Sequence, residues 1–226
     1  MNADFLITFW ISVKLATLTT IILFVIGIPL AYYLTYSKLR FKVVLQALIS
    51  MPLVLPPSVL GFYLLLAFSP NYWFGNFLNS YFNVQLAFSF AGILIGSIIF
   101  NLPFMVNAIQ SGFSNLPISL KDASYTLGKS RLTTIRKVLL PNIKPAMITG
   151  LCLTFAHTIG EFGVILMIGG NIPGKTRVAS LAVYDEVQAL NFDMANKYAI
   201  FLFLFSFVIL LIVYSINREY LKWKRF

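Results

Sequence analysis

Apolar residues along this chain gather in five long runs that are separated by shorter polar segments. The runs cover residues 10–36, 44–68, 86–113, 146–169 and 198–216. Each is long enough to cross a hydrocarbon core of roughly 30 Å, which takes about 20 helical residues. Because backbone groups in lipid must hydrogen-bond within the protein, a spanning segment is a helix or part of a closed barrel. The runs lack the alternation typical of barrel strands, so the pattern predicts an all-α, polytopic transmembrane helical bundle of about five spans.

The composition agrees with a membrane protein. The chain has 226 residues, of which 59% are hydrophobic and 11% charged, whereas a soluble domain is about one quarter charged. No basic segment precedes the first apolar run, which is therefore expected to be a retained span rather than a cleaved signal peptide. The lone cysteine, Cys152, excludes a disulfide framework or a cysteine-based metal site within the chain. We expect a single domain over residues 1–226, multi-pass in the cell membrane, with no cofactor.

The net charge of +10 comes from basic residues that cluster beside the predicted spans. Thirteen of the 17 lie between the first two runs, in the polar segment at residues 115–144, and at the C-terminal end. Basic residues beside spans mark the cytoplasmic side of a membrane protein and need no nucleic-acid partner. With five spans, all three clusters share one side if the N-terminus is outside and the C-terminus is cytoplasmic. The first and last clusters are Lys38, Arg40 and Lys42, and Arg218, Lys222, Lys224 and Arg225.

The polar segment at residues 115–144 has a helical pattern of its own. Pro117 suits the first turn of a short helix, and Gly128 suits its end, where a residue in the left-handed conformation is needed. Ser130 can cap a second short helix, which Pro141 is expected to end. Taken alone, these residues fit a solvated basic linker equally well. Apolar residues at helical spacing in the first helix are Leu116, Leu120, Ala123 and Leu127.

One motif in this segment resembles the signature loop of permeases from ABC importers. The sequence D-A-S-x-x-x-G, then nine residues, then V-x-L-P has the spacing of that family's E-A-A-x-x-x-G and I-x-L-P. The departures, Asp122 for Glu and Ser124 for the second Ala, are conservative. The resemblance implies a cytoplasmic coupling helix that docks on a dimer of ABC ATPase subunits. The residues it assigns to ATPase docking are Asp122, Ala123, Ser124, Tyr125, Leu127, Gly128, Leu140 and Pro141.

Three further motifs narrow the resemblance to molybdate importer permeases. They are M-P-L-V-L-P-P-S-V-L-G at residues 51–61, I-G-E-F-G at 159–163 and N-I-P-G-K-T-R at 171–177. The resemblance implies a homodimer that forms the translocation path, paired ATPases and an external oxyanion-binding protein. Molybdate is the expected substrate, with tungstate as a co-substrate, and a permease for sulfate, thiosulfate or another oxyanion is the alternative. The chain lacks G-x-x-x-x-G-K-[ST], so we expect a separate subunit to hydrolyse ATP and this chain not to be an enzyme.

Three prolines fall within the second apolar run. Pro52, Pro56 and Pro57 remove backbone hydrogen bonds and are expected to kink the helix, which is tolerated where protein or water satisfies the freed carbonyls. The kink is a candidate for the translocation path or gate, with the hydroxyls of Ser50 and Ser58 facing a passing anion. The alternative is a static kink that only packs the bundle.

Ionisable residues within the predicted spans are functional candidates. His157 and Glu161 are four residues apart and are expected to share one helix face. As this is the only histidine, the two do not make a zinc site. A carboxylate on an anion path would repel the substrate, so we expect Glu161 to be a structural partner of Lys14. An intramembrane enzyme built on His157 and Glu161 would lack a nucleophile motif, and a scaffold that transports nothing is the remaining alternative.

The segments at residues 69–85 and 170–197 are expected outside the cell. Residues 182–190 fit a short interfacial helix that carries Asp185 and Glu186. Lys175 and Arg177 are candidates to contact the binding protein or attract oxyanions, and they equally fit a solvated loop.

Overall fold

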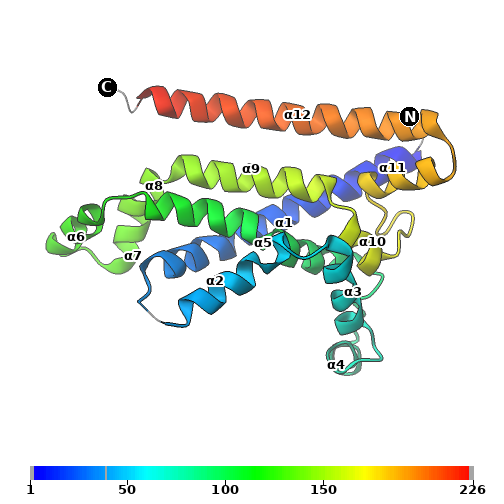
Figure 1. The fold of residues 1–226 in the computed structure, drawn as a ribbon, viewed down its shortest axis with the longest axis horizontal. Helices are drawn as coiled ribbons and strands as arrows, with labels where there is room; N and C mark the ends of the chain where they lie inside the picture. Colours follow the sequence, from blue (N-terminus) through cyan, green and yellow to red (C-terminus); the bar gives the residue numbers. More distant parts are fainter. Residues whose placement is uncertain (1–2, 39, 224–226) are drawn as a thin grey trace.

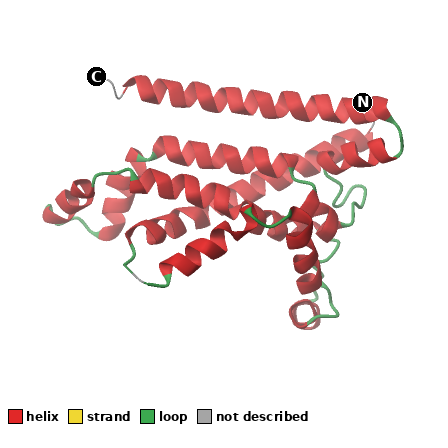
Figure 2. Cartoon of the chain, in the orientation of Figure 1, coloured by secondary structure: helices red, strands yellow, loops and turns green. Residues whose placement is uncertain are grey.

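The computed structural model describes residues 3–38 and 40–223 of the chain, and the basic residues Lys224 and Arg225 therefore lie outside the described residues. Within these ranges the chain folds into helices joined by short loops, without a strand (Figure 2). This confirms the predicted all-α class.

Four long helices form the body of the molecule. They lie roughly side by side, and α12 is at one edge (Figure 1). α1 packs against both α5 and α9, and α5 packs against α9. Their bounds are α1 (Ala3–Tyr36), α5 (Phe90–Ser114), α9 (Lys144–Gly160) and α12 (Phe192–Trp223).

Shorter elements lie at the two ends of these helices. The polar segment forms α6 (Ile118–Thr126), α7 (Arg131–Thr134), the π-helical turn η2 (Ile135–Leu139) and α8 (Leu140–Asn142). It occupies the end of the body where α12 finishes, on the left of Figure 1. At the opposite end are α10 (Gly163–Gly169) and α11 (Ala179–Gln188), near the start of α1. The second apolar run forms α2 (Lys42–Ser50), the 3-10 turn η1 (Met51–Leu53) and α3 (Pro57–Phe68), followed by α4 (Trp73–Phe82).

The core between α1, α5 and α9 depends on small residues. A Cβ on Gly27 of α1 would lie 2.8 Å from Cγ of Met105, and one on Gly112 of α5 would lie 2.6 Å from Cβ of Ala146. Small residues at these positions let helix backbones approach closely, which is how helices in lipid gain packing energy. Leu23, Met105 and Ile109 are fully buried beside these contacts.

Three helices are long and apolar enough to cross a membrane, namely residues 4–36, 90–114 and 192–212. Two bent pairs pass the same test together, which gives up to five spans. The count agrees with the prediction, but the second predicted span, residues 44–68, is not one helix.

The second run breaks between η1 and α3, where the chain turns by 109°. Pro56 and Pro57 carry no N–H group, so they cannot donate to the carbonyls of Pro52 and Leu53 four residues earlier. The helix therefore ends, and α3 projects away from the body together with α4 (Figure 1). The predicted kink is present and is sharp enough to redirect the chain.

The fourth predicted span, residues 146–169, is also interrupted. α9 ends at Gly160, and Glu161 follows with an extended backbone (ψ 130°) before α10 begins. We refer to residues 160–163 as the hinge. At its other end α9 meets the α7–α8 stretch at an angle of 76°.

Glu161 stabilises this hinge, and the expected pairing with Lys14 is wrong. Its Oε1 accepts a hydrogen bond from the backbone N–H of Val164 (3.0 Å), and its carbonyl accepts from the Ser180 hydroxyl (2.6 Å). Lys14 instead lies with Nζ 4.7 Å from the centre of the Phe90 ring. Because the helix ends at Gly160, Glu161 does not share a helix face with His157 as expected. Glu161 is buried and caps the start of α10.

Replacing Glu161 tests this capping role. Glu161→Gln keeps a side-chain oxygen that accepts from the Val164 N–H, whereas Glu161→Leu removes the side-chain acceptor and leaves only the backbone carbonyl. We expect the Leu variant to lose about 0.5–2 kcal/mol of unfolding free energy and the Gln variant to resemble the parent. The melting temperature of the purified protein in detergent measures the difference, and equal values for Gln and Leu would contradict the role.

Candidate coupling and translocation sites

The polar segment forms a helical hairpin around Gly128. α6 begins one residue after Pro117, which occupies the N-cap position, and Gly128 follows its end with φ +71°. The Gly128 N–H donates to the Tyr125 carbonyl (2.9 Å), and the Lys129 N–H donates to the Ser124 carbonyl (3.1 Å). Glycine adopts positive φ without steric cost and satisfies the last carbonyls of a helix in this way. The predicted sharp turn is confirmed.

The second helix of the hairpin starts as expected and ends later. The Ser130 hydroxyl accepts from the Thr133 N–H (3.3 Å) and caps α7. Pro141 does not end the helix, because it lies in the first turn of α8, where a missing N–H costs little. The break comes at Ile143, with φ −107° and ψ 15°.

The hairpin is held together by one buried polar contact. The hydroxyls of Ser124 and Thr134 are 2.9 Å apart, and the two residues are 4% and 0% exposed. Ser124 therefore faces α7 and not an outside partner. Its small side chain lets α6 approach α7 closely, a contact that the spacing of the sequence does not reveal.

The outer surface of the hairpin exposes several large apolar side chains, although the segment carries many charges. Leu127 is 75% exposed and Ile118 is 72% exposed, and Leu132 and Tyr125 are exposed beside them. Asp122, Ala123 and Gly128 are exposed as well, so five of the eight residues expected to dock an ATPase are exposed on the hairpin. Leu140 is half-buried against the core at this end, and Pro141 is exposed on α8.

The tyrosine on this surface stays neutral at physiological pH. Partial burial and the nearby Tyr32 phenol raise the pKa of the Tyr125 hydroxyl above its ordinary value, and the charge of Arg131 opposes this only in part. An uncharged phenol beside exposed leucine and isoleucine side chains keeps the surface suited to an apolar partner groove.

A cavity of about 360 Å³ adjoins the hinge. It brings Pro57 of the predicted proline kink together with the predicted pair His157 and Glu161. The other candidates from the kink, Ser50, Pro52, Pro56 and Ser58, do not line it. The complete lining is Pro57, Phe100, Ala156, His157, Gly160, Glu161, Phe162 and Gly163.

His157 is oriented by a residue that sequence reasoning missed. Its Nδ1 lies 2.9 Å from Oδ1 of Asn101, and Nδ2 of Asn101 donates to the Ser97 carbonyl (2.9 Å). Because an amide oxygen only accepts, His157 Nδ1 is the donor in this hydrogen bond. Nε2 is the ring nitrogen that does not contact Asn101. The ring also packs on Phe104, with centroids 4.1 Å apart. Asn101 lies within an apolar run of the sequence, where only its type, a polar amide at membrane depth, signals a role.

Two of the quoted motifs meet at the hinge. A Cβ on Gly163 would lie 2.8 Å from Cβ of Pro57, and one on Gly61 would lie 2.8 Å from Cβ of Met167. The motif at residues 51–61 therefore packs through glycine on the motif at 159–163 and on α10. This contact ties the start of α3 to the hinge, so a displacement of one requires a displacement of the other.

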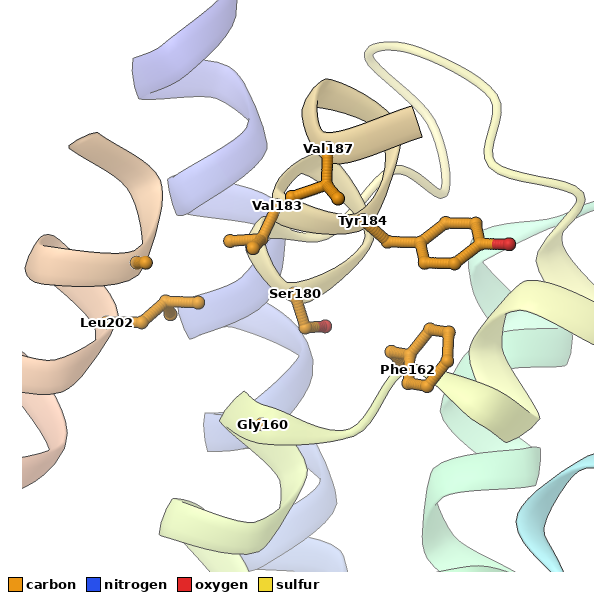
Figure 3. A pocket seen from close by; sticks show the side chains of 8 residues that line it. Gly160, Phe162, Ser180, Val183, Tyr184, Val187 and Leu202 are labelled. Carbon is orange, nitrogen blue, oxygen red and sulfur yellow. The ribbon is translucent and has the colours of Figure 1, made fainter. Parts of the chain in front are cut away.

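A second cavity, of about 480 Å³, lies on the other side of the hinge between α11 and α12 (Figure 3). Its walls are mostly apolar, and Gly160 and Phe162 line both cavities. The full set is Gly160, Phe162, Ser180, Val183, Tyr184, Val187, Ala199 and Leu202.

The loop before α11 is held by charge pairs. Arg177 Nη2 lies 3.3 Å from Asp185 and 3.7 Å from Glu186, and Nδ2 of Asn171 donates to Asp185 (2.5 Å). Arg177 is thus committed to α11, which starts three residues earlier than expected, while Lys175 is exposed. Among residues 3–38 and 40–223, no group of three or more His, Cys, Asp or Glu side chains is placed to hold a metal ion.

Comparison with known proteins agrees with this geometry. The chain is 40% identical over 208 residues to the molybdenum transport system permease protein ModB of Azotobacter vinelandii, covering 92% of each. It is 35% identical over 193 residues to the sulfate transport system permease protein CysT of Salmonella typhimurium, covering 85% of this chain and 68% of the relative.

Solved structures share the fold at low identity. A chain of the MetNI methionine ABC transporter superposes with a TM-score of 0.74 at 16% identity, covering 97% of this chain and 99% of that chain. A chain of a bacterial alginate ABC transporter, solved in complex with an alginate-bound periplasmic protein, gives 0.82 at 17% identity, covering 97% and 80%. Residues 8–222 match the family described as the binding-protein-dependent transport system inner membrane component. The chain is a multi-pass membrane protein that belongs to this family of ABC importer permeases.

Proposed function

We propose that this chain is the permease subunit of an ATP-driven importer for molybdate, with tungstate as a co-substrate, and that it acts as a homodimer. The observation that carries the proposal is the hairpin of α6 and α7, whose exposed Ile118, Tyr125 and Leu127 surround the Gly128 turn. This surface is apolar and exposed at one end of the bundle, which suits a docking element for a separate ATPase.

The hairpin end is the cytoplasmic end in this proposal. The basic residues of the 38–42 and 115–144 segments lie at this end of the body, and basic flanks face the cytoplasm. The opposite end, with α10, α11 and the Arg177 loop, then faces outside and meets an external oxyanion-binding protein. A solved alginate transporter with the same fold binds a periplasmic protein, which supports a partner of this kind.

The translocation path runs past the hinge cavity and the break between η1 and α3. The carbonyls of Pro52 and Leu53 lack their usual helical donors, and Val54 beside them is 86% exposed. Irregular backbone at membrane depth is stable only against protein or water, not against lipid. We therefore place the second copy of the chain, and the water-filled path between the two copies, on this side. Ser50, Pro52, Pro56, Pro57 and Ser58 remain the proposed gate residues.

Selectivity for the anion resides largely in the binding protein. Tight binding of an anion would need a cationic side chain beside the path. Lys14 of α1 is such a cation, but its ammonium lies over the Phe90 ring and does not line the hinge cavity. A path that held a divalent anion tightly would slow its release, so a weakly polar path suits transport.

Gly128→Pro tests docking. Proline fixes φ near −65° and removes the N–H that donates to Tyr125, so it is incompatible with φ +71° at this turn. We expect membrane insertion to persist and co-purification of the ATPase to fall by about tenfold or more, which corresponds to ~1.4 kcal/mol of binding energy. ATP-dependent uptake should fall with it.

Gly174→Pro is the matched control, because Gly174 has φ +72° and lies in the loop at the opposite end. It places the same backbone conflict away from the hairpin. ATPase co-purification should be unchanged in this variant. Loss of the ATPase in both variants, or in neither, would refute docking through the Gly128 turn.

Competition experiments test the substrate. In proteoliposomes with ATPase and binding protein, uptake of labelled molybdate should be inhibited by unlabelled tungstate, because the two tetrahedral dianions are nearly equal in size. Sulfate or thiosulfate in the same excess should leave most of the uptake intact. Equal inhibition by sulfate would assign the assembled importer, with this chain as its permease, to the alternative sulfate-type class.

A further inference from the structure

The inner end of α1 is attached to the hairpin by cation–π contacts. We propose that Tyr32 and Tyr36 of α1, together with Lys121 of α6 and Arg131 of α7, form a clamp that transmits movement of the docked hairpin to α1. This inference rests on the proposed function, because it assumes that the hairpin is moved by an ATPase.

Two cations approach two aromatic rings from the two helices of the hairpin. Lys121 Nζ lies 4.6 Å from the centre of the Tyr36 ring and 5.8 Å from that of Tyr125. The Arg131 guanidinium carbon lies 5.1 Å from the centre of the Tyr32 ring. These distances are within the range of about 6 Å in which the contact is attractive. Within the described part of the chain, neither cation forms an ion pair, so the aromatic rings provide the electrostatic contacts of both.

The tyrosines are fixed within the bundle. Tyr32 is 6% exposed, and its ring centre lies 4.9 Å from that of Tyr36. Both rings meet the edge of Phe113 on α5, at 5.8 and 6.1 Å, and the Tyr36 hydroxyl donates to the Phe113 carbonyl (3.4 Å). A force on either ring is therefore a force on the packed ends of α1 and α5.

The hairpin is built to move as one piece. The buried Ser124–Thr134 contact joins α6 to α7, so Lys121 and Arg131 keep their spacing when the hairpin shifts. Two attachment points on one rigid element also resist rotation, which a single contact would allow. The clamp adds α1 to the helices that the hairpin already moves through its covalent links to α5 and α9.

α1 carries the movement to the other end of the molecule. There the Ser12 hydroxyl accepts from the Ala179 N–H (2.7 Å) at the start of α11, and the next residue, Ser180, donates to the Glu161 carbonyl in the hinge. The clamp, α1 and these two hydrogen bonds form a continuous chain of contacts from the hairpin to the hinge cavity. Coupling through this chain means that a perturbation at the hairpin end is measurable as a change in transport.

The test compares ring removal with ring retention. Tyr36→Leu removes the ring, and Tyr36→Phe keeps it and removes only the hydroxyl. Lys121→Gln removes the cation, and Lys121→Arg keeps it. Tyr33→Leu is the control, because Tyr33 is exposed on the same turn of α1 and is not part of the clamp. Each permease is reconstituted with its ATPase and binding protein, and molybdate uptake and ATP hydrolysis are measured together.

We expect Tyr36→Leu and Lys121→Gln to keep the ATPase bound and to lower the molybdate transported per ATP by about fivefold, in keeping with the modest strength of a cation–π contact. Tyr36→Phe, Lys121→Arg and Tyr33→Leu should match the parent. The double variant Tyr36→Leu/Lys121→Gln should be no worse than either single one, because both remove the same contact.

Several outcomes would overturn the clamp. One is an unchanged amount of molybdate transported per ATP in Tyr36→Leu and Lys121→Gln. Others are an equal loss in Tyr36→Phe and Tyr36→Leu, or additive losses in the double variant. Loss of the bound ATPase from Lys121→Gln would instead place Lys121 in the docking surface. If the parent chain itself fails to bind the ATPase or to transport molybdate, the proposed function is wrong. That outcome is distinct from a change in molybdate transported per ATP between the variants and the parent.

Discussion

The constraint on which this structure depends is that lipid offers a peptide backbone no hydrogen-bond partner. Helical segments meet it internally, which is why long runs such as α1 and α5 are unbroken. The informative places are those where the chain leaves the helix within the bundle. At the hinge, the Glu161 side chain and the Ser180 hydroxyl supply the missing partners. Before α3, Pro56 and Pro57 leave carbonyls without helical donors, and the chain there needs water or a second copy.

The hinge and the start of α3, the two places where the chain leaves the helix, pack against each other. Gly163 packs on Pro57 at a distance that only glycine allows, and the hinge cavity lies beside that contact. In the proposed mechanism, the permease changes shape at the point where the substrate passes and keeps its helical core rigid. Short helices joined at glycine and proline provide such a point, whereas the core of α1, α5 and α9, closely packed around Met105, provides the rigid part.

Local features of the fold were predictable from the sequence, and tertiary contacts were not. The apolar runs, the Gly128 turn and the Ser130 cap follow from residue type and spacing over a few positions. The 109° break was foreseen only as a kink, because proline shows where a helix ends but not where the chain goes next. Opposite charges in lipid are expected to pair, which predicts a contact between Lys14 and Glu161. In the structure the Lys14 ammonium lies over the Phe90 ring, and the Glu161 carboxylate accepts from the Val164 N–H. Asn101, Tyr32 and Tyr36 depend on partners dozens of residues away, which spacing along one chain does not reveal.

Docking of an ATPase requires the Gly128 hairpin to face the cytoplasm and the Arg177 loop to face outside. Single cysteines at the exposed positions Lys129 and Lys175, each in a Cys152→Ser background, test this with a membrane-impermeant maleimide. We predict that Lys175→Cys is labelled on intact spheroplasts and Lys129→Cys only in inside-out vesicles. Labelling of Lys129→Cys from outside the cell would contradict the assignment of the hairpin as the docking element.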